Sequence, residues 1–127
     1  MVGINCKVGC IYVLYYNNKP FYIGQTKDRL RTRIRKHFNS CFSSSSRYYY
    51  VYDFIKSKTT KDNFYNDITY KCLKICNVND LDFEEVKYIK HCIDKDVKLF
   101  NSCVKTISYI SKKHGMTIQE YNYTRKA

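Results

Sequence analysis

The segment from residue 10 to residue 24 constrains the fold of this chain most strongly. Its two halves, residues 10–16 (CIYVLYY) and 20–24 (PFYIG), are rich in aromatic and β-branched side chains. Residues 17–19 (NNK) between them have the composition of a turn. Because two strands joined by a turn have this pattern, we expect an antiparallel hairpin.

The register of this hairpin decides which side chains share a face. A two-residue loop would place Tyr12 and Tyr22 on opposite faces of the sheet. A three-residue loop over residues 17–19 pairs Tyr12 with Gly24 instead. Tyr22 then pairs with Leu14, and both phenols lie on one face, about 7–8 Å apart as diagonal neighbours. We expect this second register, in which Gly24 leaves open space beside Tyr12.

A basic amphipathic helix is expected after the hairpin. Thr26 or Asp28 can cap it, and apolar side chains recur along it at helical spacing to about residue 38. Arg33 and His37 lie four residues apart at the edge of this apolar stripe, so both can be half buried against the sheet. Other cationic side chains of the helix point outward: Arg29, Arg31, Arg35 and Lys36.

The remaining elements complete a small sheet with helices packed on it. Residues 48–56 are expected to form a second helix and residues 56–66 a polar connector. Residues 68–75 (ITYKCLKI) have the composition of a strand. A third helix is expected from Asp80 or Asp82 to about residue 92, with Val86, Ile89 and Ile93 facing inward. The predicted fold class is α/β (α+β): a three-stranded antiparallel sheet flanked by three to four helices.

Length and charge restrict the organisation and the partners. A chain of 127 residues supports one domain with a core, which we place at residues 1–103, followed by a basic extension at 104–127 of unassigned role. The net charge of +12 predicts a polyanionic partner. Fourteen tyrosines suit stacking and hydroxyl contacts with nucleic acid.

Apolar runs and cysteines indicate the compartment. The sequence has no stretch of 18 or more apolar residues and no apolar signal-like segment at its start, so we expect a soluble, intracellular protein with no membrane partner. Seven cysteines at irregular positions fit reduced thiols better than a disulfide framework. Cys72 and Cys76 have a zinc-like spacing, but in a strand they would lie about 13 Å apart, too far for one tetrahedral ion.

Two short motifs carry a family resemblance. Cys10-Ile11-Tyr12 and Tyr22-Ile23-Gly24, followed by Arg33 and His37, resemble the paired signature of the GIY-YIG nuclease family. Cys10 replaces the first glycine of that signature, although Gly9 lies beside it.

The resemblance continues downstream. Glu85 and the Phe100-Asn101 pair resemble the metal-binding glutamate and the late asparagine of the family, so the similarity spans roughly residues 9–101. It implies a magnesium-dependent endonuclease that hydrolyses DNA, with Mn²⁺ as a substitute metal. Composition alone does not separate DNA from RNA.

We expect Glu85 to be the metal ligand and Tyr12 to be the general base or the group that positions the water. Glu85 is preferred to Glu84 because the helical wheel turns Glu84 further toward solvent. A free phenol has a pKa near 10, so Tyr12 needs a nearby positive charge to ionise at neutral pH. Arg33, His37 or the metal would provide that charge.

The other site residues are assigned to substrate and proton handling. Arg33 would bind the scissile phosphate in bidentate fashion. Tyr22 would hydrogen-bond the phosphate or the water, His37 would accept or relay a proton, and Asn101 would fix a loop near the metal. The remaining residues expected to bind substrate are Gly24, Arg29, Arg31, Arg35 and Lys36.

Two other functions fit the sequence. One is a catalytically silent nucleic-acid-binding module of the same fold, and the other is a basic scaffold in which the tyrosines only form the core. Because the chain has little room for a targeting domain, we expect shape-directed selectivity, or targeting by a partner protein or a homodimer.

Overall fold

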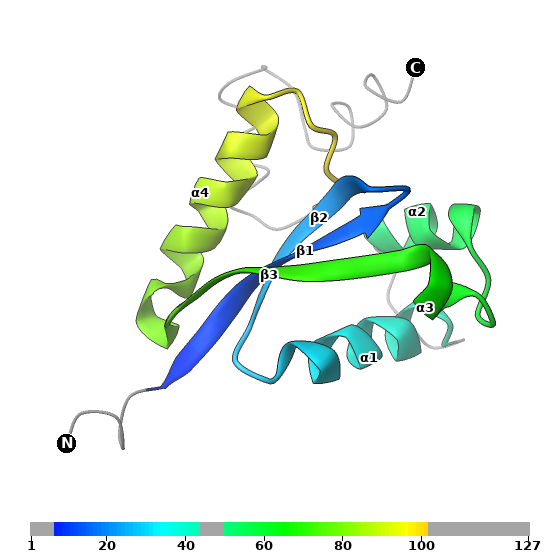
Figure 1. Cartoon of the computed structure of the whole chain (residues 1–127), viewed down its shortest axis with the longest axis horizontal. Coiled ribbons are helices and arrows are strands. Elements are labelled where there is room, and N and C mark those ends of the chain that lie inside the picture. The colour runs from blue at the N-terminus through cyan, green and yellow to red at the C-terminus, as the bar shows by residue number, and fades with distance from the viewer. Residues whose placement is uncertain (1–6, 44–49, 102–127) are drawn as a thin grey trace.

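The computed structural model describes residues 7–43 and 50–101 (Figure 1). The expected basic extension at 104–127 lies outside these residues. The elements follow one another as β1 (Val8–Tyr16), β2 (Lys19–Thr26), α1 (Leu30–Cys41), α2 (Tyr50–Lys58), α3 (Phe64–Asp67), β3 (Ile68–Asn77), the 3₁₀ helix η2 (Val78–Asp80) and α4 (Leu81–Asp94).

The sheet has three antiparallel strands, as the sequence predicts, and their order is β2-β1-β3. Helix α1 covers one face and α4 covers the other (Figure 1). Alternate residues of the central strand serve the two cores: Tyr12 and Leu14 pack on the α1 side, and Ile11 and Val13 pack on the α4 side. Burial on both faces explains why β1 is apolar almost throughout. The expected α+β fold class is confirmed.

The hairpin reaches the expected pairing by a different route. Tyr12 pairs with Gly24 and Leu14 with Tyr22, but the turn contains only Asn17 and Asn18, both with positive φ. The expected three-residue loop is therefore wrong. A register shift between Leu14 and Tyr15 leaves one extra residue in β2. This bulge places Tyr12 and Tyr22 on the same face, whereas a two-residue turn without a bulge would place them on opposite faces.

Helix α1 begins and ends later than expected. Neither Thr26 nor Asp28 caps it, because Arg29 is the N-cap residue and makes no side-chain cap bond. The Thr26 hydroxyl instead accepts a hydrogen bond from the Asp28 backbone N–H at 3.0 Å. The helix continues to Cys41, whose side chain is buried in the α1-side core.

The later elements differ from the prediction mainly at their ends. Helix α2 runs to residue 58, and the expected connector at 56–66 contains the start of α3. Strand β3 extends to residue 77, two residues further than expected. In α4, Ile89 and Ile93 are buried as predicted, whereas Val86 is only half buried. No helix in the described part of the chain is long and apolar enough to cross a membrane.

Candidate active site

The hydroxyl of Tyr12 is the centre of a buried polar cluster. Tyr12 lies on the central strand with no exposed surface. Its Oη is hydrogen-bonded to Nε2 of His37 at 2.6 Å and accepts a hydrogen bond from Nε of Arg33 at 3.3 Å. Arg33 and His37 are four residues apart in α1, so one face of that helix presents both to the phenol.

His37 links Tyr12 to a residue that the sequence analysis missed. Its Nδ1 lies 3.0 Å from Oη of Tyr52 in α2, within hydrogen-bond distance. Burial, together with the positive charge of Arg33, lowers the pKa of His37 to about 3. The imidazole is therefore neutral at pH 7, with one nitrogen that donates and one that accepts. The tyrosine-rich sequence of α2 was the only signal that pointed to Tyr52.

Tyr22 shares the face of Tyr12, as predicted. Its ring centroid lies 6.2 Å from that of Tyr12 and 5.4 Å from the imidazole of His37. Tyr22 is half buried, whereas Tyr12 behind it is enclosed. Of the two phenols, Tyr22 is the one that a ligand approaching from solvent meets first.

Gly24 makes room for Tyr12 and not for a ligand. A Cβ added to Gly24 would lie 2.5 Å from Oη of Tyr12 and 2.8 Å from Cε2 of Tyr22. The expected open space beside Tyr12 is thus filled by the phenol itself, and that prediction is wrong. Glycine is required here because the two tyrosine rings pack directly against its backbone.

The ionisation of Tyr12 also differs from the expectation. Burial raises the pKa of Tyr12 to about 12, and the opposing charge of Arg33 does not offset it. Burial also raises the pKa of Tyr22 well above its ordinary value. His37 adds no positive charge because it is neutral. Both phenols are therefore protonated at pH 7 in this protein.

Glu84 and Glu85, adjacent residues of α4, have different electrostatic neighbours. Both residues are buried, Glu84 at 9% exposure and Glu85 at 7%. The Glu84 carboxylate forms salt bridges with Lys74 at 3.2 Å and Lys87 at 3.4 Å. The negative charge of Glu85, in contrast, contributes to raising the pKa of both Tyr12 and Tyr22. Of the two carboxylates, Glu85 is therefore the one whose charge acts on the phenols.

Asn101 acts on a strand and not on a loop. Its Oδ1 accepts a hydrogen bond from the backbone N–H of Ile23 at 3.1 Å, and its Nδ2 donates to the Ile23 carbonyl at 2.5 Å. Because Ile23 lies between Tyr22 and Gly24, Asn101 holds the part of β2 that carries both. Its expected place in a loop near the metal is corrected to this backbone contact.

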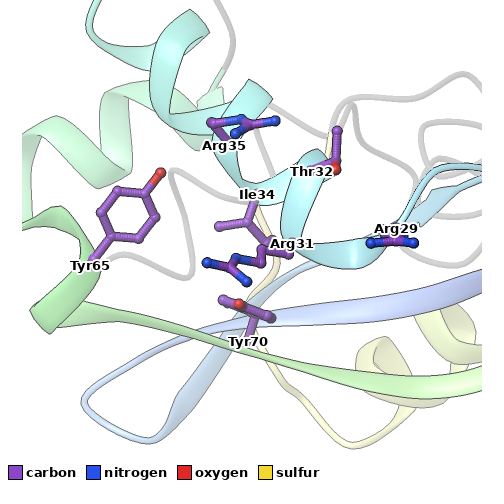
Figure 2. A pocket seen from close by; sticks show the side chains of 7 residues that line it. All are labelled: Arg29, Arg31, Thr32, Ile34, Arg35, Tyr65 and Tyr70. Carbon is purple, nitrogen blue, oxygen red and sulfur yellow. The ribbon is translucent and has the colours of Figure 1, made fainter.

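The outward cations of α1 fall into two groups. Lys36 forms a salt bridge with Asp28 at 2.8 Å. Three arginines, Arg29, Arg31 and Arg35, line a separate cavity next to α1 (Figure 2).

The donor set suits a hard divalent cation with one protein carboxylate. Within residues 7–43 and 50–101, no group of three or more His, Cys, Asp or Glu side chains is placed to hold a metal ion. Mg²⁺ binds through one or two carboxylates together with waters and substrate phosphates. The buried Glu85 beside two phenols fits that mode. The described cysteines are free thiols: Cys10, Cys41, Cys72, Cys76 and Cys92.

Comparison with known proteins identifies the family. The family model described as the GIY-YIG catalytic domain matches residues 8–97, which is most of the chain. No curated protein and no solved structure matches the chain. The matched range contains the hairpin, α1 with Arg33 and His37, and α4 with Glu85. The chain therefore belongs to the GIY-YIG nuclease superfamily and has its nuclease-type fold.

Proposed function

We propose that this protein is a metal-dependent endonuclease that hydrolyses phosphodiester bonds in DNA. One observation carries the proposal: Tyr12 meets Arg33 and His37 at hydrogen-bond distance, and the charge of Glu85 reaches the same phenol. These groups come from β1, α1 and α4. Hydrolysis of a phosphodiester needs a proton acceptor, a cation for the growing charge and a positioned water, and this cluster provides groups for each task.

Arg33 is placed to bind the scissile phosphate. Burial alone would lower the pKa of Arg33, but the neighbouring Tyr12, Tyr22 and Tyr52 together outweigh it and leave the pKa above its ordinary value. The guanidinium is therefore always charged. Its Nε–H is directed at Tyr12, and the group has four further N–H donors, which match two oxygens of a phosphate.

Tyr12 and His37 act as a proton relay in this mechanism. A phenol with a pKa of about 12 is not ionised at pH 7, so Tyr12 must lose its own proton as it accepts one. The attacking water transfers a proton to Oη of Tyr12, and Tyr12 passes its proton to Nε2 of His37. In this tautomer, Nδ1–H of His37 donates to Tyr52. The phosphorus forms a bond to the water oxygen, its bond to the sugar oxygen breaks, and the sugar oxygen takes a proton from solvent to leave as a hydroxyl.

Glu85 is the proposed holder of the divalent cation, Mg²⁺ or Mn²⁺, which when bound neutralises charge on the scissile phosphate. The proposal rests on the burial of Glu85 and its position beside the phenols. Mg²⁺ and Mn²⁺ both take oxygen ligands, so the donor set does not distinguish them.

Nicking of supercoiled plasmid tests this function. With Mg²⁺ the wild type is expected to produce nicked circles, and with a chelator it is not. Glu85→Gln should lower the nicking rate by at least about a hundredfold, because a metal contributes several kcal/mol of charge stabilisation. Glu84→Gln is the matched control, since the Glu84 carboxylate is adjacent in sequence but forms salt bridges with Lys74 and Lys87. Equal rates for the two variants would remove Glu85 from this role.

The domain limits and the targeting belong to the same proposal. We place the nuclease domain at residues 1–103, and we assign no role to the basic extension at 104–127. The described domain is small, so we propose shape-directed selectivity, or targeting by a partner protein or a homodimer. Cleavage of plain duplex at one defined sequence by the isolated chain would contradict this.

The enclosure of Tyr12 favours a second candidate, a nucleic-acid-binding module without turnover. A phenol with no exposed surface and a pKa of about 12 does not reach water in the described geometry. If this candidate is right, wild-type protein binds DNA but leaves plasmids, forks and four-way junctions uncut with Mg²⁺ or Mn²⁺. Metal-dependent nicking of any of these substrates would exclude it.

A further inference from the structure

A cavity of about 420 Å³ lies beside α1, apart from the Tyr12 cluster. Three elements form its walls: α1 with its N-cap residue provides Arg29, Arg31 and Arg35, α3 provides Tyr65, and β3 provides Tyr70. Figure 2 shows Arg31 between Ile34 and Tyr70, with Tyr65 on the opposite side of the hollow. Its volume is in the range of pockets that hold small organic ligands.

The sheet register places this cavity within reach of the active site. Leu14 on the central strand pairs with Tyr22 on one side and Tyr70 on the other. Residues in one cross-strand row project to the same face, so both tyrosines lie on the face that α1 covers. Two strand spacings separate their backbones by about 10 Å. Because one DNA strand rises about 3.4 Å per nucleotide, this is the span of about three nucleotides.

The cavity carries uncompensated positive charge. Arg29, Arg31 and Arg35 are exposed, and none forms an ion pair with any described residue, in contrast to Lys36, which pairs with Asp28. Unpaired guanidinium groups at exposed positions favour phosphate binding. A nucleic acid backbone is the polyanion that fits a chain with this family membership.

The aromatic walls are pre-positioned. The Tyr65 ring stacks on Phe38 with centroids 5.2 Å apart at 28°, and Phe64 meets it edge-on at 5.0 Å. Tyr65 is nevertheless 55% exposed, and Tyr70 is 41% exposed. Packing on one side therefore orients the Tyr65 ring while much of its surface stays available to a ligand.

We propose that this cavity binds an unpaired nucleotide of the substrate, with the base stacked on Tyr65 or Tyr70 and its phosphate held by Arg31 and Arg35. Bases inside a duplex are stacked on one another and do not enter a hollow of this size, whereas an unpaired base presents its π-face to aromatic side chains. The inference names the substrate of the proposed nuclease, DNA with a single-stranded segment, and to that extent it rests on the proposed function.

Fluorescence anisotropy with chelator present tests the cavity without cleavage. The probes are a labelled single-stranded oligonucleotide and a duplex of the same length. The double variant Tyr65→Ala/Tyr70→Ala should weaken single-strand binding by at least about tenfold, because stacking is lost. Duplex binding should change far less. Tyr65→Phe/Tyr70→Phe keeps both rings and should bind single strands like the wild type.

Two further variants control for misfolding and for the loss of any exposed aromatic side chain. Tyr70→Ser alone should weaken single-strand binding, and it leaves the packing of Tyr65 on Phe38 and Phe64 intact. Phe83→Ala is the matched control, since Phe83 is an exposed aromatic residue beside Lys87 and outside the cavity. Wild-type single-strand binding by the double variant, an equal loss on duplex, or an equal loss in Phe83→Ala would each overturn the proposal.

The two proposals fail separately. If the wild type nicks plasmid but the tyrosine variants bind single strands normally, the nuclease stands and the cavity proposal fails. If the tyrosines are required for single-strand binding and no substrate is cut, the binding site stands, and its assignment to a nuclease substrate fails.

Discussion

The two sides of α1 differ in burial and in charge. On the β2 side, Arg33 and His37 meet Tyr12 in a cluster from which solvent is largely excluded. On the β3 side, Arg31 and Arg35 line an open cavity with two exposed tyrosines. The two pairs have the same four-residue spacing but are offset by two residues, which is more than half a helical turn. One short helix thus separates proposed chemistry from proposed binding.

The two sides of α1 also differ in how many of their groups are charged. In the enclosed cluster, Tyr12, Tyr22 and His37 are neutral at pH 7 and Arg33 is charged, because burial disfavours ionised phenols and imidazolium. The cavity keeps its charges in contact with water, where they attract a polyanion at little desolvation cost. If this reading is right, changes on the β2 side alter the rate of cleavage, and changes on the β3 side alter affinity.

The largest expected effect follows from removing one hydroxyl of the enclosed cluster. Tyr12→Phe deletes the proposed relay atom and should lower the single-turnover nicking rate by about 10²- to 10⁴-fold. Tyr16→Phe is the control, because Tyr16 lies on the same strand and packs edge-on against Phe54. A Tyr12→Phe variant as fast as Tyr16→Phe would show that the phenol takes no part in chemistry.

A charge-conserving pair of substitutions sharpens the comparison between the two sides of α1. Arg33→Lys keeps one positive charge but loses the planar fork, and it should lower the single-turnover rate at saturating DNA by about 10²-fold. Arg35→Lys should instead raise the dissociation constant for single strands and change the saturated rate little. The same pattern in both variants would mean that α1 does not separate binding from catalysis.

The shared face of Tyr12 and Tyr22 was predictable because strand alternation and the family motifs both require it. The bulge that produces it was not predictable, since Asn17 and Asn18 fit a two-residue turn and nothing local marks an extra residue in β2. The sequence predicted the correct pairing of Tyr12 with Gly24, but it explained that pairing by a longer loop, whereas the structure has a two-residue turn and a bulge. The face on which each strand residue lies is thus better predicted from the side chains that must be buried than from the length of the turn.

Long-range packing accounts for the other differences. The filling of Gly24 by the Tyr12 ring depends on the angle at which two rings pack across strands. The ion pair of Glu84 depends on Lys74, which lies on β3 and is ten residues away in sequence. Neither the packing of the Tyr12 ring on Gly24 nor the position of Lys74 beside Glu84 can be read from the local sequence pattern. Tyr52 was missed for the same reason, since its role is visible only once α2 lies against His37.

The pH dependence of stability tests whether the cluster is as enclosed as its geometry indicates. Burial and Arg33 lower the pKa of His37 from an ordinary value of 6.5 to about 3. Between these values the unfolded chain binds a proton that the folded chain does not, so this part of the stability is present above pH 6.5 and lost progressively below it. The loss should reach about 2 kcal/mol at pH 5 relative to pH 7.5.

Urea unfolding at these two pH values, compared between the wild type and His37→Gln, isolates this contribution. His37→Gln should flatten the dependence, because glutamine does not titrate, whereas His91→Gln on the exposed surface of α4 should keep it. The groups around His37 are Tyr12, Tyr22, Tyr52 and Arg33. Phenols and guanidinium do not titrate between pH 5 and 7.5, so they do not mask the effect. A wild type equally stable at both pH values would place His37 in contact with water, and the contrast between the two sides of α1 would then be lost.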